Sequence, residues 1–283
     1  MTIIETKGLK YRYPDMEGLA LNDLSFQIKQ SEFIGVIGKN TSGKSTLCFA
    51  LAGIVPHFFK GAYGGEVIVD GVKVKEAEIY QIAEKVGLVF ENPFSQMTGS
   101  KYTVFEEIAF GLENLGLPRE EMIQRVNESL DLLNISALKD KNPFDLSGGQ
   151  MQRVAIASVL AMKPKILILD EPTSQLDPQG TEEVYQVVED LTNLGMTIIL
   201  AEQKMEKMAE YADRILLLHE GKLIDFATPE EIFSRKDLHT FGIEGPIVTE
   251  VARELQLIDE STGYYPITNK EFVNLFSKKR RTE

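Results

Sequence analysis

At residues 38–46 the sequence reads Gly38-Lys39-Asn40-Thr41-Ser42-Gly43-Lys44-Ser45-Thr46, between an apolar run at 33–37 and a helix-like run at 47–54. This order of strand, glycine-rich loop and helix is typical of a P-loop. The loop amides and the helix N-terminus point at one spot, where they bind phosphate. We expect Lys44 to reach the β- and γ-phosphates of a nucleotide and Ser45 to hold Mg²⁺. The alternative, a glycine-rich turn with a solvated lysine, fits the flanking strand and helix less well.

A second glycine-containing segment is predicted to begin a helix that binds an anion. Leu146-Ser147-Gly148-Gly149-Gln150 opens an amphipathic run that continues to Met162. The glycines allow the backbone to approach a ligand closely, and a helix that begins here directs the positive end of its dipole outward.

Two carboxylates directly follow an apolar run. Asp170 and Glu171 come after Ile166-Leu167-Ile168-Leu169, the pattern of a buried parallel strand whose carboxyl end meets a ligand. Asp170 is expected near Mg²⁺, and Glu171 is expected to orient and deprotonate a water that attacks the γ-phosphate. Acidic residues after strands are often solvated loop residues, but this pair accompanies a P-loop in the same chain.

The rest of the chain predicts further strands and an inserted group of helices. The first forty residues alternate apolar and polar positions around a turn at 14–18, which predicts antiparallel strands. Residues 102–138 predict a helical subdomain, because apolar residues recur at helical spacing: Val104, Ile108, Leu112 and Leu115. A helix at about 181–194 and a core strand at 197–201 follow.

Length, charge and cysteine usage narrow the class of protein. The chain has 283 residues, a net charge of -13, one cysteine and three histidines. This length suits one large α/β domain with an appendage, or two small domains. The single cysteine, Cys48, excludes an internal disulfide, and the scattered histidines argue against a zinc site. The acidic balance argues against broad nucleic-acid binding. Because no apolar run could cross a bilayer and no signal pattern opens the chain, we expect it in the cytosol unless a partner holds it elsewhere.

Together, the P-loop, residues 146–150, the strand with its two carboxylates and residues Ser174 to Asp177 resemble the ATP-binding cassette (ABC) ATPases over residues 1–235. The resemblance implies an α/β P-loop NTPase of ABC type. It would have an antiparallel β subdomain, an inserted helical subdomain at about 98–162 and a small C-terminal helical extension at 236–283. Two cassettes would pair head to tail, with each ATP between the P-loop of one chain and the signature segment Leu146 to Gln150 of the other.

The resemblance also implies a role for each matching residue. Tyr13 would stack on adenine, although a tyrosine on an edge strand is more often packing. Gly38 to Thr46 would bind phosphate and Mg²⁺, Asp170 would support Mg²⁺, and Glu171 would be the catalytic base. Ser147 and Gly149 would contact the partner's γ-phosphate. Asp177 would link the two sites.

Three positions depart from the family pattern. Thr41 replaces the usual third glycine, a mild change where its backbone angles suit a side chain. Glu91 replaces a glutamine that touches Mg²⁺; a carboxylate still ligates the metal, but its charge disfavours the closed state until the metal neutralises it. After the strand at 197–201 the family has a histidine that contacts the γ-phosphate, and spacing puts Gln203 there. By sequence position none of the three histidines, His57, His219 and His239, replaces it.

The changed residues predict tight binding of ATP and slow hydrolysis at this chain's own site. Losing one contact to the transition state costs about 2.7–4 kcal/mol, and Gln203 still donates one hydrogen bond. The signature segment, in contrast, matches in full.

The C-terminal residues indicate which subgroup of the ABC ATPases the chain resembles. After Pro246 comes an amphipathic helix, and Thr268 caps a second one. This tail resembles that of cobalt- and vitamin-type energy-coupling-factor ATPases, in which it helps to pair the cassettes. We interpret the chain as the ATPase subunit of such an importer, peripheral on the cytoplasmic face of the membrane, with ATP and Mg²⁺ as cofactors and a vitamin or a metal ion as cargo.

The implied partners are an identical or a different second cassette, a membrane coupling subunit and a substrate-binding membrane protein, without nucleic acid. Residues 91–100 are expected to line the groove that receives a helix of the coupling subunit. Two other functions stay open. One is a non-transport ABC ATPase, against which stand the acidic balance and the lack of zinc-ligand cysteines. The other is a regulatory cassette that clamps ATP without hydrolysing it, which Glu91 and Gln203 favour.

Overall fold

Two sheets organise the computed structural model, which describes residues 1–174 and 176–282, with side chains to residue 279. A six-stranded sheet has the order β10-β9-β3-β8-β7-β6, and a four-stranded sheet has the order β2-β1-β4-β5. The strands are β1 (Thr2–Arg12), β2 (Leu21–Lys29), β3 (Phe33–Ile37), β4 (Ala62–Val69), β5 (Val72–Lys73), β6 (Val86–Val89), β7 (Ile166–Asp170), β8 (Thr197–Ala201), β9 (Arg214–His219) and β10 (Lys222–Ala227).

The six-stranded sheet brings three loops to one edge. β9, β3, β8, β7 and β6 pair in parallel, and only β10 runs antiparallel, beside β9. β3, β7 and β8 are five-residue strands buried along their whole length, as the predicted apolar runs require. Because their carboxyl ends meet at the same edge, the P-loop after β3, the carboxylates after β7 and the residues after β8 lie together.

The sheet separates two hydrophobic cores. Side chains alternate between the faces, so that Leu167 and Leu169 of β7 join one core while Ile166 and Ile168 join the other. The second core is closed by the antiparallel sheet, in which β1 pairs with β2 and with β4. This confirms the antiparallel strands predicted for the N-terminal forty residues.

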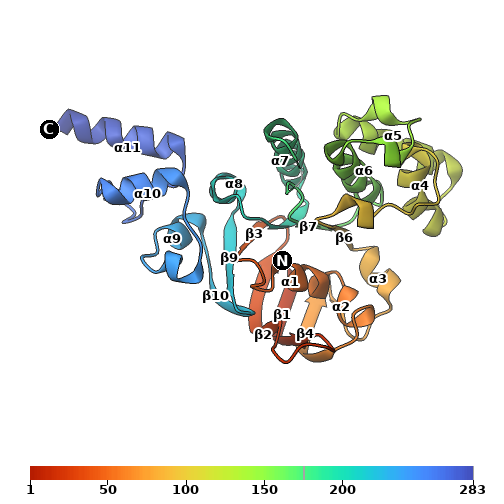
Figure 1. Cartoon of the computed structure of the whole chain (residues 1–283), viewed down its shortest axis with the longest axis horizontal. Helices are drawn as coiled ribbons and strands as arrows, with labels where there is room; N and C mark the ends of the chain where they lie inside the picture. The colour runs from red at the N-terminus through yellow and green to blue at the C-terminus, as the bar shows by residue number, and fades with distance from the viewer. Residues whose placement is uncertain (175, 283) are drawn as a thin grey trace.

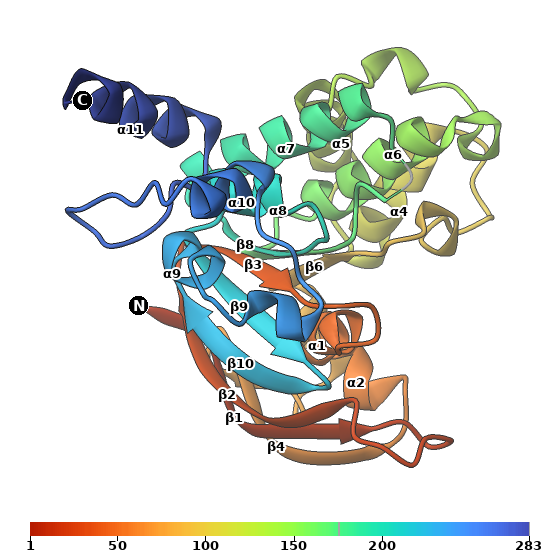
Figure 2. The same ribbon diagram turned by 60° about the vertical axis from the view of Figure 1, so that its left-hand side comes forward.

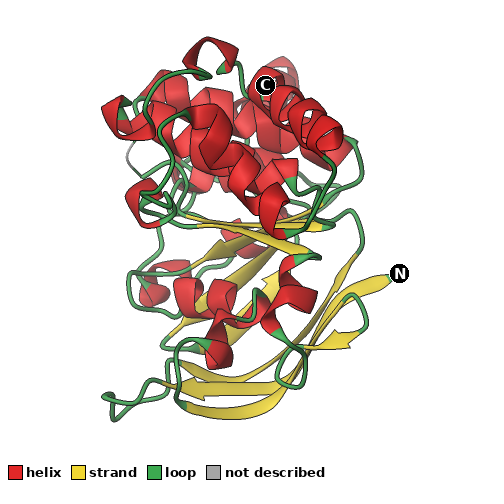
Figure 3. Ribbon diagram, turned by 90° about the vertical axis from the view of Figure 1, so that its right-hand side faces the viewer, coloured by secondary structure: helices red, strands yellow, loops and turns green. Residues whose placement is uncertain are grey.

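The helices form separate groups around the sheets (Figure 1). The longer ones are α1 (Lys44–Leu51), α4 (Val104–Asn114), α5 (Arg119–Leu132), α6 (Gly148–Ala161), α7 (Pro178–Asn193), α10 (Ile247–Glu254) and α11 (Asn269–Thr282). The shorter ones are α2 (Ile54–His57), α3 (Ile79–Ala83), α8 (Met205–Tyr211) and α9 (Pro229–Phe233), with 3₁₀ turns at η1 (Pro93–Ser95), η2 (Ser136–Leu138), η3 (Pro143–Asp145) and η4 (Leu238–Phe241). Figure 3 shows most helices on one side of the main sheet and the strands of the antiparallel sheet on the other.

The predicted helical subdomain consists of α4, α5 and α6, which pack on one another. Thr103 begins α4 through a capping box with Glu106. Val104, Ile108 and Leu112 are buried at the predicted helical spacing, and Leu115, the C-cap residue, is 38% exposed. Leu115 lies past the last turn, because Gly116 adopts a φ of +69° and ends the helix.

Two helix starts outside the helical subdomain are set by caps. α7 begins at Pro178, earlier than the expected Thr181, because the Asp177 carboxylate accepts a hydrogen bond from the Gly180 amide at 2.7 Å. The capping of α11 by Thr268 is as predicted, with Thr268 Oγ1 accepting from the Glu271 amide at 3.3 Å.

In Figure 2, α10 and α11 lie beyond α9, away from the antiparallel sheet. Within the described residues, no helix is long and apolar enough to span a bilayer.

Candidate functional site

The P-loop wraps around the ammonium group of Lys44. Lys44 Nζ donates to the Gly38 carbonyl at 2.9 Å and lies 3.3 Å from Glu171 Oε1. Gly38 is required here, because a Cβ atom would lie 2.3 Å from Ser42 Oγ and 2.5 Å from the Leu218 carbonyl. Gly43, with a φ of +106°, turns the chain into α1. The loop therefore presents a buried lysine beside the start of a helix, as a phosphate site requires.

Thr41 departs from the expectation of a mild change. Its φ is +67°, in the left-handed region, which costs a residue with a Cβ atom about 1–2 kcal/mol. Thr41 Oγ1 donates to the Asn40 carbonyl at 2.5 Å. The threonine thus keeps the backbone shape that a glycine would adopt without strain.

Asp170 lies at the end of β7 beside the P-loop helix. Ser45 Oγ donates to Asp170 Oδ1 at 3.1 Å. Burial raises the pKa of Asp170 to about 6; the bond from Ser45 opposes the shift, and the negative charges of Glu171 and Glu91 add to it. The Ser45 hydroxyl and the Asp170 carboxylate are oxygen ligands of the kind that Mg²⁺ binds, and the positive charge of the metal would offset the free energy that ionising Asp170 costs. Mg²⁺ usually takes only a few ligands from the protein and its other ligands from phosphate and water. Among the described residues no group of three or more His, Cys, Asp and Glu side chains could hold a metal by itself.

Glu171 and Gln203 are in direct contact. Gln203 Nε2 donates to Glu171 Oε2 at 2.8 Å, while Glu171 Oε1 faces Lys44. Glu171 has a φ of +46°, and its amide donates to the Ala201 carbonyl at the end of β8. The carboxylate is therefore held between a lysine and an amide, at the place where the sequence predicted a base.

A cavity of about 510 Å³ joins most of the predicted nucleotide-binding residues. Tyr13 lies at one end, with its hydroxyl 3.3 Å from Thr46 Oγ1 and its ring edge-on to Tyr11 and Phe59. The lining also includes Asn40, Thr41, Gly43, Lys44, Ser45, Glu91, Glu171 and Gln203. Three residues that sequence patterns did not identify, Met16, Leu19 and Ala20, close the side next to Tyr13. The turn between β1 and β2 was the signal that could have identified them.

The signature segment lines a different cavity, of about 430 Å³. Ser147 begins α6 through a capping box with Gln150, and Leu146 is buried. Gly148, Gly149, Arg153 and Asp177 complete this side of the cavity, which shares no residue with the cavity at the P-loop. Gln175, within the predicted segment Ser174 to Asp177, lies outside the described residues. Within one chain, therefore, the two halves of the predicted ATP site do not meet.

Two more residues near Gln203 were not identified from the sequence. Glu202 is 3% exposed; its carboxylate accepts from the Thr173 hydroxyl at 3.1 Å and from the Gln203 amide at 3.2 Å. His239, which by its sequence position was not expected to replace the family histidine, lines a third cavity together with Gln203 and P-loop residues. Neither contact follows from a motif, because both depend on how distant segments pack.

Comparisons with known proteins agree with this geometry. The pattern of a family described as ABC transporter matches residues 21–174. A putative ABC transporter ATP-binding protein of Pyrococcus abyssi is 43% identical over 258 residues, which cover 90% of this chain and 91% of the relative. The energy-coupling factor transporter ATP-binding protein EcfA1 of Streptococcus thermophilus is 42% identical over 277 residues, 96% of each chain.

Solved structures are similar as well. CbiO1 from Clostridium perfringens, described as part of the ABC transporter complex cbiONQ, superposes with a TM-score of 0.74 at 34% identity, covering 90% of this chain and 96% of that one. A dimeric ATP-binding cassette bound to ADP and Pi superposes with a TM-score of 0.71 at 26% identity, covering 80% of this chain and 99% of that one.

Proposed function

The chain belongs to the ABC transporter ATP-binding proteins, and from this premise we propose that it drives an energy-coupling-factor importer by hydrolysing ATP between two cassettes. The cargo is a vitamin or a metal ion. Residues 1–235 form the ATPase domain, with the helical subdomain at about 98–162, and residues 236–283 form an extension that helps to pair the cassettes. The protein works at the cytoplasmic face of the membrane.

The observation that carries this proposal is the separation of two half-sites in one chain. Lys44, Ser45 and Glu171 line one cavity, whereas Ser147 and Gly149 line another. A head-to-tail pair brings a P-loop half and a signature half together twice, because a two-fold interface repeats each contact. The dimeric cassette that superposes on this chain supports such a pair.

In this arrangement each residue has a defined task. Tyr13 stacks on the adenine ring, Lys44 binds the β- and γ-phosphates, and the P-loop amides hold the remaining phosphate oxygens. Glu171 orients the attacking water and accepts its proton, while the hydrogen bond from Gln203 fixes the carboxylate. Ser45 and Asp170, with Glu91 at the cavity wall, would hold Mg²⁺, which neutralises charge on the phosphates. Ser147 and Gly149 act on the partner's ATP.

The membrane partners follow from the relatives that this chain resembles. EcfA1 is by its name a component of energy-coupling factor transporters, and cbiO1 is described as part of a complex. We propose that a coupling subunit docks on the surface at 91–100 and that a separate membrane protein binds the cargo. The second candidate function, a cassette that clamps ATP without hydrolysis, is favoured by Glu91 and Gln203; release of phosphate by a purified complex in which the partner's own catalytic base has been replaced excludes it.

Lys44→Ala tests the proposed nucleotide site. Binding stabilises a protein by about 2.7 kcal/mol at a ligand concentration of 100 times Kd, so MgATP should raise the melting temperature of the wild-type chain. In Lys44→Ala the rise should disappear, because the phosphates lose their buried cation. Lys60→Ala, at an exposed lysine outside the cavity, should keep it. An unchanged rise in Lys44→Ala would remove the P-loop as the binding site.

A further inference from the structure

A third cavity, of about 480 Å³, lies between the P-loop and the segment that carries His239. Its lining includes Lys39, Asn40, Gln203, His239, Gly242 and one carboxylate, Glu244. Asn40 and Gln203 also line the nucleotide cavity, so the two spaces adjoin at these side chains. In the proposed function Gln203 fixes Glu171, the base beside the terminal phosphate, so this cavity adjoins that end of the nucleotide.

The backbone of His239 is held at this cavity by a turn, and the residue is exposed. η4 carries His239, and Leu238 beside it is buried. The Gly242 amide donates to the His239 carbonyl at 3.0 Å, with Gly242 in the left-handed region at a φ of +72°. Gly242 also packs against the P-loop, because a Cβ atom added to it would lie 3.1 Å from Lys39 Cδ.

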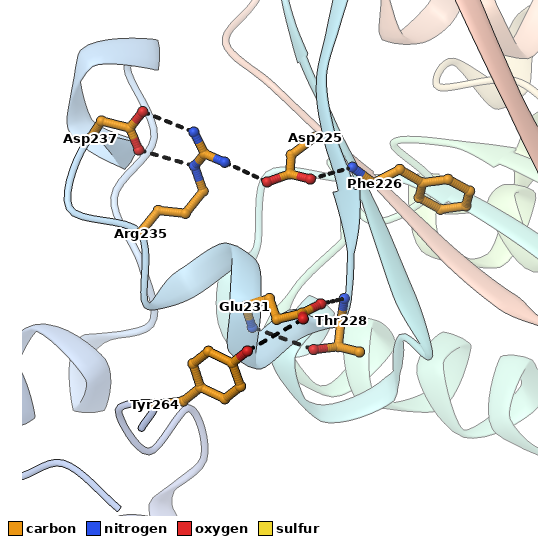
Figure 4. A network of polar contacts seen from close by, with 7 residues as sticks. All are labelled: Asp225, Phe226, Thr228, Glu231, Arg235, Asp237 and Tyr264. Carbon is orange, nitrogen blue, oxygen red and sulfur yellow. Dashed lines mark hydrogen bonds and ion pairs between the residues drawn. The ribbon is translucent and has the colours of Figure 1, made fainter. Parts of the chain in front are cut away.

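A network of ion pairs ties this turn to the main sheet (Figure 4). Arg235 donates from Nε and Nη2 to both oxygens of Asp237, at 3.0 and 2.8 Å, and pairs with Asp225 of β10 through Nη1. The ring of Phe241 then packs edge-on against His219 of β9 at 5.3 Å between centroids. A guanidinium shared between two carboxylates restricts the segment on which His239 stands.

The groups that line this cavity leave room for a second hydrogen-bond donor to the terminal phosphate, besides the amide of Gln203. The amide of Gln203 is engaged with Glu171, and Lys39 and Glu244 bring one positive and one negative charge to the same cavity. An imidazole donates an N–H hydrogen bond in either protonation state. We propose that His239 contacts the terminal phosphate of ATP bound at this chain's own P-loop, and so supplies the imidazole that the chain lacks after β8. This inference rests on the proposed hydrolysis of ATP at that site.

The inference gives the C-terminal extension a second task. Arg253 of α10 donates to the carbonyls of Phe233 and Arg235, at 3.0 and 3.3 Å, which joins α10 to the segment that carries His239. The extension thus contributes a residue to the reaction as well as to the pairing of cassettes.

Vanadate trapping tests the inference in the purified membrane complex. Azido-ATP radiolabelled on the α-phosphate binds in the dark, and with Mg²⁺ and vanadate it is retained only at a site that reaches the transition state. Light then attaches the label to each chain separately. His239→Ala should lower the vanadate-dependent label on this chain about 10²-fold, the loss typical of removing one donor to the transition state. Label bound without vanadate should stay within about twofold of wild type.

Three variants separate the possible outcomes. Gln203→His in the His239→Ala background should restore trapping, because it returns an imidazole to the family position; a merely structural role of His239 would leave trapping low. Lys236→Ala, at an exposed neighbour, should trap like wild type. Loss of all label in Lys44→Ala together with wild-type trapping in His239→Ala would overturn this inference alone. Undiminished label in Lys44→Ala would overturn the proposed function.

Discussion

The carboxyl group of Glu202 is buried directly next to Gln203, and no sequence motif predicts its burial. Burial raises the pKa of Glu202, and the bonds from Gln203 and Thr173 only partly oppose this. A carboxyl group whose pKa is higher in the folded than in the unfolded protein favours folding through its protonated form. Stability is therefore lost as pH rises from the ordinary carboxyl value, 4.5, through the raised one, and the loss is complete above it.

Glu202→Gln should accordingly raise the melting temperature at pH about 8, with a smaller difference from wild type at pH about 4.5. The amide oxygen can accept from the Gln203 amide, and the amide nitrogen can donate to the Thr173 hydroxyl. Thermal unfolding at both pH values checks this. Glu220→Gln, at a side chain that is 84% exposed, serves as the control and should show no such difference. A Glu202→Gln variant that is less stable at the higher pH would contradict the stated cost of ionisation.

At the scale of elements, η1 presents the surface proposed to receive the membrane subunit. Phe94 is 53% exposed and Ser95 is exposed, whereas Gln96 accepts from the Phe90 amide at 3.2 Å and donates to the Ala155 carbonyl at 3.2 Å. A cysteine at Gln96 would remove both bonds, so Ser95 is the better position for a probe.

Ser95→Cys should crosslink to the membrane coupling subunit in intact complexes, since the exposed turn faces outward beside Phe94. The native Cys48 is buried and will not compete. Lys222→Cys, on the edge strand β10, should give no crosslink to that subunit. Crosslinks from Ser95→Cys to a second ATPase chain alone would place the docking surface elsewhere.

How far the sequence predicts these elements depends on how local the signal is. The P-loop, β7 with Asp170 and the capped start of α6 at Ser147 were predicted, because loop glycines, apolar runs and caps act over a few residues. The contacts of Gln96 and the burial of Glu202 were not, since they join residues far apart in the chain. From its sequence position, His239 was not expected to lie near Gln203. The packing of η4 against the P-loop brings the two residues to the same cavity.

At the scale of the whole molecule, the two half-sites predict an asymmetric complex when the partner is a different cassette. The half with the P-loop carries Glu91 and Gln203 in place of the family residues, and His239 would replace only the imidazole, whereas the half with Ser147 matches in full. In the proposed head-to-tail pair these halves serve different ATP molecules. The partner's site, completed by Ser147 and Gly149 of this chain, should therefore carry most of the turnover.

Two variants of the reconstituted complex test this asymmetry. Glu171→Gln should lower the steady-state ATPase rate only modestly, because it affects the slower site. Ser147→Arg should nearly abolish the rate, since its bulk blocks the partner's γ-phosphate. Both variants should keep the MgATP-dependent rise in melting temperature of the isolated chain, which shows that the P-loop is intact. Equal, near-total losses would show that this chain's own site is a required catalyst.

The pair of hydrogen bonds made by Gln96 also has a mechanical meaning. One bond holds the end of β6, and the other holds the middle of α6, the helix that starts at Ser147. Under the proposed function, a displacement of η1 by the docked membrane subunit would therefore reach α6 through Gln96, and α6 begins at Ser147, which acts on the neighbouring chain's nucleotide. Each cassette would then pass a change at its membrane contact to the other chain's ATP.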